Sequence, residues 1–212
     1  MAAPAHERQH LLHCALHATN SLLQGRGAAF TAADFNGIAA GLHAREAALG
    51  SAGWLNAHRS LLAPLGDWSV EVVAAALASR GLELQHFSPA LPAHAPRAAR
   101  AAGLLLNRSS RGLWAAALGA RHWVALARVG GVWWDADSRL AAPRRLGALG
   151  DALALLAAEP AGTQCFTVCE LPGEAAQAPA APEAAAPAAP EAAAPAAAEA
   201  AAPAAAEAAA QL

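Results

Sequence analysis

A cysteine near the start of the chain is in a position that favours nucleophilic chemistry. Cys14 stands where a helix is predicted to begin, and the backbone N–H groups and the dipole at a helix N-terminus favour a thiolate over a thiol. A thiolate held in this way can attack a carbonyl carbon. The alternative interpretation is that Cys14 serves as a small buried apolar residue, which is a common role for cysteine.

The stretch from His122 to Asp137 predicts a β-hairpin that would supply a base and an acid. Its two runs, HWVALARV and VWWDADSRL, flank Gly130 and Gly131, a pair typical of a two-residue turn. With that turn, Asp137 lies opposite Val124 and is the diagonal neighbour of His122 on one face. The carboxylate could then fix the imidazole tautomer and leave the other ring nitrogen to take a thiol proton. A surface cross-strand pair is the alternative, and a turn shifted by one residue would separate the two side chains.

The histidines around Cys14 offer a competing interpretation, a metal site. His10, His13, Cys14 and His17 are spaced to share one face of a helix, and histidines at this spacing can hold zinc. This interpretation requires the helix to begin before His10, and no acidic second shell or CxxC pair is evident nearby. We therefore favour a site without metal.

Composition argues against several classes of protein. The 212 residues carry 14 arginines and no lysine against 16 acidic residues, for a net charge of −2. No stripe dense in arginine is present, which argues against a nucleic-acid-binding protein. No apolar run of about 18 residues is free of charge and proline, and the N-terminus lacks the order of a secretory signal. We therefore expect a soluble protein of the cytoplasm, with the nucleus as a further compartment and no transmembrane segment.

The other two cysteines, Cys165 and Cys169, lie in TQCFTVCEL, which predicts a β-strand. Within one strand their α-carbons would be about 13 Å apart, whereas a disulfide needs less than about 7 Å. The two thiols therefore cannot pair within that strand. A small, odd number of cysteines suits a reducing compartment.

The composition changes sharply near Gly173. From Glu174 onward the chain repeats an octet of alanine, glutamate and proline, in which Pro187, Pro195 and Pro203 recur every eight residues. These prolines interrupt any helix before it settles, and an alanine face has little to bury. We predict a single domain over residues 1–173 and a mostly disordered tail over residues 174–212.

Within residues 1–173, helices are predicted first and an antiparallel meander of strands follows, which is an α+β arrangement. Ser69 can cap one of these helices and Gly81 can end it. The predicted helices cover residues 14–24, 31–42, 54–65, 70–80 and 146–158, and the predicted strands cover residues 82–87, 104–107, the two runs of the hairpin and the segment around Cys165.

Four stretches together resemble the Josephin family of papain-like cysteine deubiquitinases. They occur in the family's order and near its spacing, and they span most of residues 6–171. The matching stretches are HERQHLLHCALHATNSLLQ at 6–24, LNAHRSLLAPLGDWSVEVVAAAL at 55–77, GLELQHFSP at 81–89 and RHWVALARVGGVWWDADSRL at 121–140. The resemblance implies a papain-like fold with a helical arm, here residues 31–65, over the cleft.

The resemblance also assigns roles to individual residues. It makes Cys14 the nucleophile, His122 the general base and Asp137 the group that orients the base. It makes Gln9 the residue whose side-chain amide helps to bind the oxyanion, a role that position alone did not suggest. It implies hydrolysis at the C-terminal glycine of ubiquitin without a metal or organic cofactor.

The resemblance further places ubiquitin contacts at a helix start. Val70 and Glu71 match residues that contact ubiquitin in some members, while Arg80 stands where the family has a bulky aromatic residue. We therefore expect a deubiquitinase whose partners are ubiquitin or ubiquitinated proteins, with a monomer as the expected state. Two alternatives stay open: a weak or inactive ubiquitin-binding module, and a papain-like thiol hydrolase with another substrate.

Overall fold

The computed structural model describes residues 3–11, 13–53, 55–58, 68–109 and 121–171. The chain divides into two units, Met1–Pro179 and Ala180–Leu212, and all described residues belong to the first. The predicted domain boundary after residue 173 and the predicted disordered tail lie outside the described residues and stay predictions.

In the described residues, six strands form one antiparallel sheet with the order β1-β6-β2-β3-β4-β5. The predicted meander holds from β2 to β5, whereas β6 returns to lie between β1 and β2. The strands are β1 (Leu82–Phe87), β2 (Gly103–Ser109), β3 (Arg121–Val129), β4 (Val132–Asp135), β5 (Arg144–Gly147) and β6 (Gln164–Glu170).

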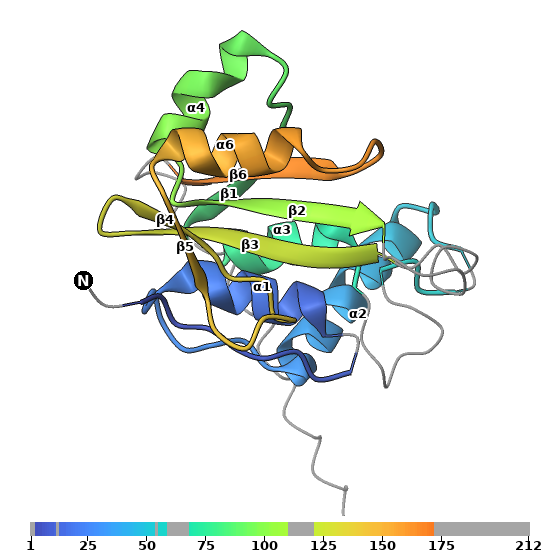
Figure 1. The fold of residues 1–212 in the computed structure, drawn as a ribbon. Coiled ribbons are helices and arrows are strands. Elements are labelled where there is room, and N and C mark those ends of the chain that lie inside the picture. The colour runs from blue at the N-terminus through green and yellow to red at the C-terminus, as the bar shows by residue number, and fades with distance from the viewer. Residues whose placement is uncertain (1–2, 12, 54, 59–67, 110–120, 172–212) are drawn as a thin grey trace, which may run out of the picture. The chain divides into compact units, whose positions relative to one another are not determined.

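Helices cover both faces of the sheet (Figure 1). On one face lie α1 (Cys14–Leu23), α2 (Ala32–Ala48) and α3 (Val70–Ala78), and on the other lie α4 (Ala95–Arg100) and α6 (Leu149–Ala157). A short 3₁₀ turn, Pro92–His94, precedes α4. The arrangement confirms the predicted α+β class.

Alternation along the strands explains why both faces are apolar. On β3, Trp123 and Ala125 face α1 and α3, whereas Val124 and Leu126 face α4 and α6. All four side chains are buried. The first core, under α1, supports the part of the molecule that carries Cys14.

A glycine lets α1 approach the sheet closely. A β-carbon added at Gly103 of β2 would meet Leu22 Cδ2 and would lie 2.9 Å from the carbonyl oxygen of Leu126. Gly103 pairs with Ala127 of β3. The C-terminal part of α1 therefore packs closely against the start of β2 and the C-terminal end of β3, because Gly103 has no side chain to intervene.

Three of the predicted helices differ from the structure. The helix predicted over residues 146–158 begins only at Leu149, because Arg144–Gly147 forms the edge strand β5. Gly147 then takes φ +119°, and the Asp151 side chain accepts from the Ala148 N–H at 2.8 Å.

The helix predicted over 31–42 continues to Ala48, and α4 was not predicted. For the helix predicted over 54–65, residues 54 and 59–65 lie outside the described residues, and residues 55–58 are not helical.

Candidate active site

The predicted hairpin forms with the predicted register. Gly130 and Gly131 adopt φ +57° and +80°, Val129 pairs with Val132, and Leu126 pairs with Asp135. Beyond the strand, the Ala136 N–H donates to the Ala125 carbonyl oxygen at 2.8 Å. The pairing therefore continues to the residue before Asp137.

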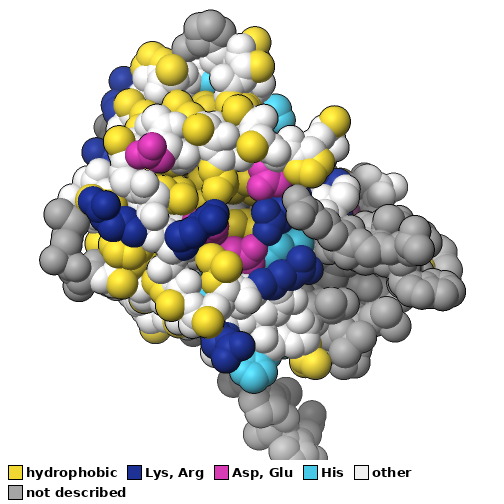
Figure 2. All heavy atoms as spheres, in the orientation of Figure 1, with side chains coloured by type: hydrophobic (Ala, Val, Ile, Leu, Met, Phe, Trp, Pro, Cys, Tyr) yellow, Lys and Arg dark blue, Asp and Glu magenta, His cyan; other side chains and the backbone are white. Residues whose placement is uncertain are grey.

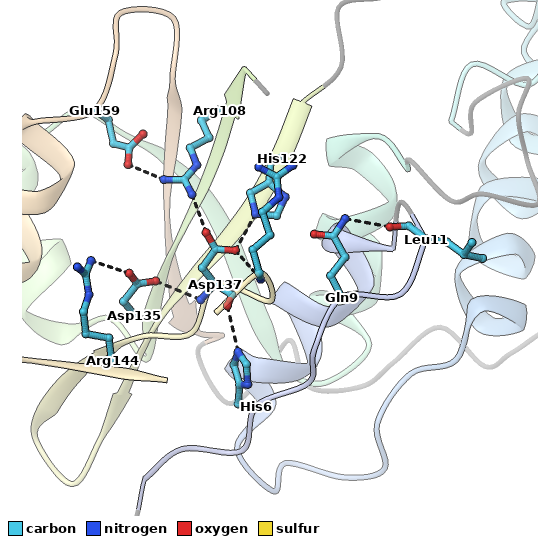
Figure 3. A network of polar contacts seen from close by, with 10 residues as sticks. His6, Gln9, Leu11, Arg108, His122, Asp135, Asp137, Arg144 and Glu159 are labelled. Carbon is cyan, nitrogen blue, oxygen red and sulfur yellow. Dashed lines mark hydrogen bonds and ion pairs between the residues drawn. The ribbon is translucent and has the colours of Figure 1, made fainter. Parts of the chain in front are cut away.

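This register brings His122 and Asp137 together (Figure 3). His122 Nε2 lies 2.7 Å from Asp137 Oδ1, and the histidine is fully buried. A carboxylate oxygen only accepts, so Nε2 carries the proton. In the described part of the chain, His122 Nδ1 is buried and has no hydrogen-bond partner. That nitrogen can therefore accept a proton from another group.

The Asp137 carboxylate is held from three sides. Its Oδ1 also accepts from the Arg139 backbone N–H at 2.9 Å, and its Oδ2 accepts from Arg108 Nη2 at 2.6 Å. Burial opposes ionisation, but the hydrogen bonds from His122 and Arg139 and the charges of His122 and Arg108 outweigh it and hold the pKa of Asp137 below its ordinary value. The carboxylate is therefore ionised at neutral pH.

Cys14 is the first residue of α1, as predicted, and is 3% exposed. The N–H groups in this first turn have no acceptors within the helix. α1 packs along β3, the strand that begins at Arg121 and carries His122 (Figure 1). Helix and hairpin are thus neighbouring elements of one core.

The segment before α1 runs beside the end of the hairpin. The Gln9 backbone N–H donates to the Ser138 carbonyl oxygen at 2.8 Å, and the His6 ring donates to the Asp137 carbonyl oxygen at 3.0 Å. The Gln9 side-chain amide donates to the Leu11 carbonyl oxygen at 2.9 Å, and Leu11 has a left-handed φ of +52°. Gln9 thus belongs to the same local structure as Asp137 (Figure 3).

The histidines considered as metal ligands have other contacts. His17 Nδ1 donates to Glu7 at 2.7 Å, and His17 Nε2 accepts from the His10 N–H at 3.3 Å. Because the helix begins at Cys14, His10 is outside it. Residues 3–11, 13–53, 55–58, 68–109 and 121–171 contain no group of three potential ligands placed to hold a metal ion.

Comparison with known proteins identifies the family of the chain. Residues 9–169 match the Josephin family. The chain is 38% identical to human Josephin-2 over 169 residues, which are 76% of this chain and 81% of the relative. It is 32% identical to a Josephin-like protein of Drosophila melanogaster over 158 residues, which are 73% and 67% of the two chains. The chain belongs to the Josephin family.

Josephin proteins are a family of cysteine deubiquitinases, and membership implies ubiquitin binding. Among the described residues, no helix combines the length and the apolar character that a membrane crossing requires.

The residues expected to contact ubiquitin lie at the start of α3. Val70 is partly buried against the core, whereas the Glu71 side chain is 55% exposed and lies 4.0 Å from His58 Nδ1. Arg80 lies over the Phe30 ring with its Cζ 4.7 Å from the centroid. That arginine therefore packs onto the loop between α1 and α2.

Sequence reasoning missed Arg108, which contacts Asp137, and Glu159, which contacts Arg108. Arg108 pairs with His122 across β2 and β3, and Glu159 follows α6. No local motif marks either residue. Only the pairing of β2 with β3, across residues 110–120, places Arg108 next to the hairpin.

Proposed function

We propose that this Josephin protein is a thiol deubiquitinase that hydrolyses bonds at the C-terminal glycine of ubiquitin. Cys14 is the nucleophile, His122 the base, Asp137 the group that orients the base, and Gln9 an oxyanion donor. The observation that carries the proposal is the buried hydrogen bond between His122 and Asp137, which leaves the other ring nitrogen able to take a proton.

The packing of α1 supports the position of Cys14. Leu22 lies against Gly103, the residue that pairs with Ala127 near the end of β3. Cys14 precedes Leu22 by two helical turns, about 12 Å along the axis. Because α1 packs along β3, this displacement directs Cys14 toward the start of the strand, where His122 lies.

In the proposed reaction, the Cys14 thiolate attacks the carbonyl carbon and the carbonyl electron pair moves to oxygen. The Gln9 amide and the Cys14 backbone N–H stabilise the oxyanion. The intermediate collapses, the amine leaves with the proton of the His122 imidazolium, and a thioester remains. His122 then takes a proton from water, whose oxygen attacks the thioester and releases the thiolate.

Other parts of the proposal concern recognition and location. The N-terminal end of α3, with Val70 and Glu71, would contact ubiquitin, and residues 31–65, which include α2, would form the helical arm over the cleft. We propose the cytoplasm as the compartment, with the nucleus as a further one.

A ubiquitin probe with an electrophile at its C-terminus tests the proposal. We expect the full chain to form a covalent adduct, and Cys14→Ala to form none while still binding ubiquitin. Cys165→Ala is the matched control and should leave the adduct intact. Tight binding by the wild-type chain without an adduct would indicate a binding module. Labelling by small thiol reagents alone would indicate a hydrolase with another substrate.

A further inference from the structure

A chain of alternating charges reaches the candidate base along the face of the sheet that α6 covers, because Arg108 pairs with His122 across β2 and β3. Glu159 Oε1 lies 3.0 Å from Arg108 Nη1, and Arg108 Nη2 lies 2.6 Å from Asp137 Oδ2. Asp137 Oδ1 in turn accepts from His122. Figure 3 shows Arg108 between the two acids, with His122 on the other side of Asp137.

Burial makes these contacts stronger than ordinary surface pairs. The side chains of Asp137 and Glu159 are 8% and 10% exposed, and that of Arg108 is 28% exposed. These three residues come from different parts of the fold: β2, the end of the hairpin and the second residue after α6. On the face of the molecule that Figure 2 shows, arginine and acidic side chains lie side by side near the middle.

We propose that Arg108 is a positioning residue that fixes the Asp137 carboxylate toward His122, and that Glu159 sets how strongly Arg108 neutralises that carboxylate. Only the expected effect on catalysis rests on the proposed function. The arrangement of charges can be tested without a substrate.

The sign of each effect follows from Coulomb's law. A more negative environment at Asp137 favours the His122 imidazolium, and a more positive one disfavours it. Arg108→Met removes a positive charge, so His122 should hold its proton to higher pH. Glu159→Gln leaves the charge of Arg108 uncompensated, so His122 should lose its proton at lower pH. The double variant, Arg108→Met with Glu159→Gln, restores the local balance of charge but not the hydrogen bond from residue 108 to the Asp137 carboxylate.

Other polar groups around Asp137 remain in place in all these variants. The His6 ring donates to the Asp137 carbonyl oxygen, and the Asp137 backbone N–H donates to the Asp135 carboxylate. Asp135 in turn accepts from Arg144 at 2.8 Å. Cys14 lies on α1 and is the proposed partner of His122, so an ionisable thiol at this position would complicate the measurement. The measurement is therefore made in the Cys14→Ala background.

The experiment follows the His122 ring by nitrogen-correlated NMR in the full chain, with His122→Gln to assign its signals. We expect Arg108→Met to raise the midpoint of the titration by about one pH unit and Glu159→Gln to lower it by a similar amount. The double variant should return close to the parent midpoint. Arg144→Met is the matched control, because its partner is Asp135, and it should move the midpoint far less.

Unchanged midpoints in both Arg108→Met and Glu159→Gln, or shifts of the same sign, would overturn the inference. Glu159→Gln keeps the test decisive if Arg108→Met fails to fold, because Arg108 remains.

Turnover of a ubiquitin substrate separates the two proposals. In each single variant, the alkaline limb of the pH profile of kcat/KM should shift in the same direction as the His122 titration midpoint. The double variant should keep the wild-type alkaline limb, but its kcat/KM should fall about tenfold. A wild-type chain that does not turn over ubiquitin, with the NMR shifts present, would contradict only the proposed function. Normal turnover with no shift of the limb would contradict only the role of Arg108.

Discussion

The backbone N–H of Gln9 donates to the carbonyl oxygen of Ser138 at 2.8 Å, which joins the segment before α1 to the residue after Asp137. The contact uses main-chain atoms, so it does not depend on the Gln9 side chain. The candidate oxyanion donor is thus fixed to the structure that holds the candidate acid. Changes to the Gln9 side chain leave this main-chain contact intact but also affect the hydrogen bond from its amide to the Leu11 carbonyl oxygen at 2.9 Å, so the unfolding midpoint is measured together with the kinetics.

Gln9→Glu should lower kcat by about 100-fold with little change in KM, because a carboxylate would repel the developing oxyanion. Gln9→Ala should cost less, since it removes a donor without adding charge. Steady-state kinetics with a fluorogenic ubiquitin substrate gives both constants. A Gln9→Glu protein with normal kcat and a normal unfolding midpoint would remove Gln9 from the mechanism.

The hairpin was predictable because its information is local. The turn glycines have positive φ, which few other residues adopt readily, and the register then follows residue by residue to Asp137. The neighbours of Asp137 were not predictable in this way. The pairing of Arg108 with His122 spans residues 110–120, whose length and composition define no turn.

The same distinction explains the differences elsewhere in the sheet. β5 has only four residues, and its sequence RRLG has no alternation of apolar and polar side chains. The place of β6 between β1 and β2 depends on contacts between distant segments. Sequence pattern indicates that a strand exists at Cys165, but not which neighbours it takes.

Gly103→Ala should lower the free energy of unfolding by about 1–3 kcal/mol, because the new methyl group meets Leu22 and the Leu126 carbonyl oxygen. Gly41→Ala is the matched control. A β-carbon at Gly41 meets no atom within 4 Å, and the residue is exposed in the interior of α2. That substitution should raise stability by about 0.5–1 kcal/mol. Urea unfolding measures both, and equal effects would show that α1 does not depend on close approach at Gly103.

The pH dependence of stability should report the lowered pKa of Asp137. A carboxyl group with a pKa lower in the folded state contributes stability that is fully present above its unfolded pKa, about 3.9, and is lost as pH falls through the folded value. The difference in unfolding free energy between wild type and Asp137→Asn should therefore be largest near neutral pH and shrink below about pH 4. A difference that is constant from pH 7 to pH 3 would contradict this assignment.

Cys165 should be almost inert in the folded protein. Burial, assisted by the charge of Glu159, raises the pKa of its thiol from 9.0 to about 11. At pH 8 this lowers the thiolate fraction about 100-fold relative to the unfolded chain. Alkylation with iodoacetamide, followed peptide by peptide, should therefore be at least that much slower than in urea. Comparable rates in the two states would show that the thiol is accessible and ionised. The raised pKa also predicts that stability falls as pH rises from about 9 to 11.

Asn20 holds both main-chain groups of Phe30. Its Oδ1 accepts from the Phe30 N–H at 2.8 Å, and its Nδ2 donates to the Phe30 carbonyl oxygen at 3.0 Å and to Glu7 at 3.2 Å. The side chain therefore ties α1 both to the following loop and to the N-terminal segment that carries Gln9.

Asn20→Asp keeps the shape and the acceptor but replaces the donor with a carboxylate facing the Phe30 carbonyl and Glu7. It should destabilise the fold by at least about 1–3 kcal/mol, the cost of leaving buried polar groups without partners. Ser21→Ala is the matched control on the next residue, because the buried Ser21 hydroxyl makes no hydrogen bond within the described residues. That change should be neutral or slightly stabilising, since it removes a buried group whose desolvation is not compensated. Thermal and urea unfolding distinguish the two. Equal stability of Asn20→Asp and Ser21→Ala would show that the N-terminal segment is held without Asn20.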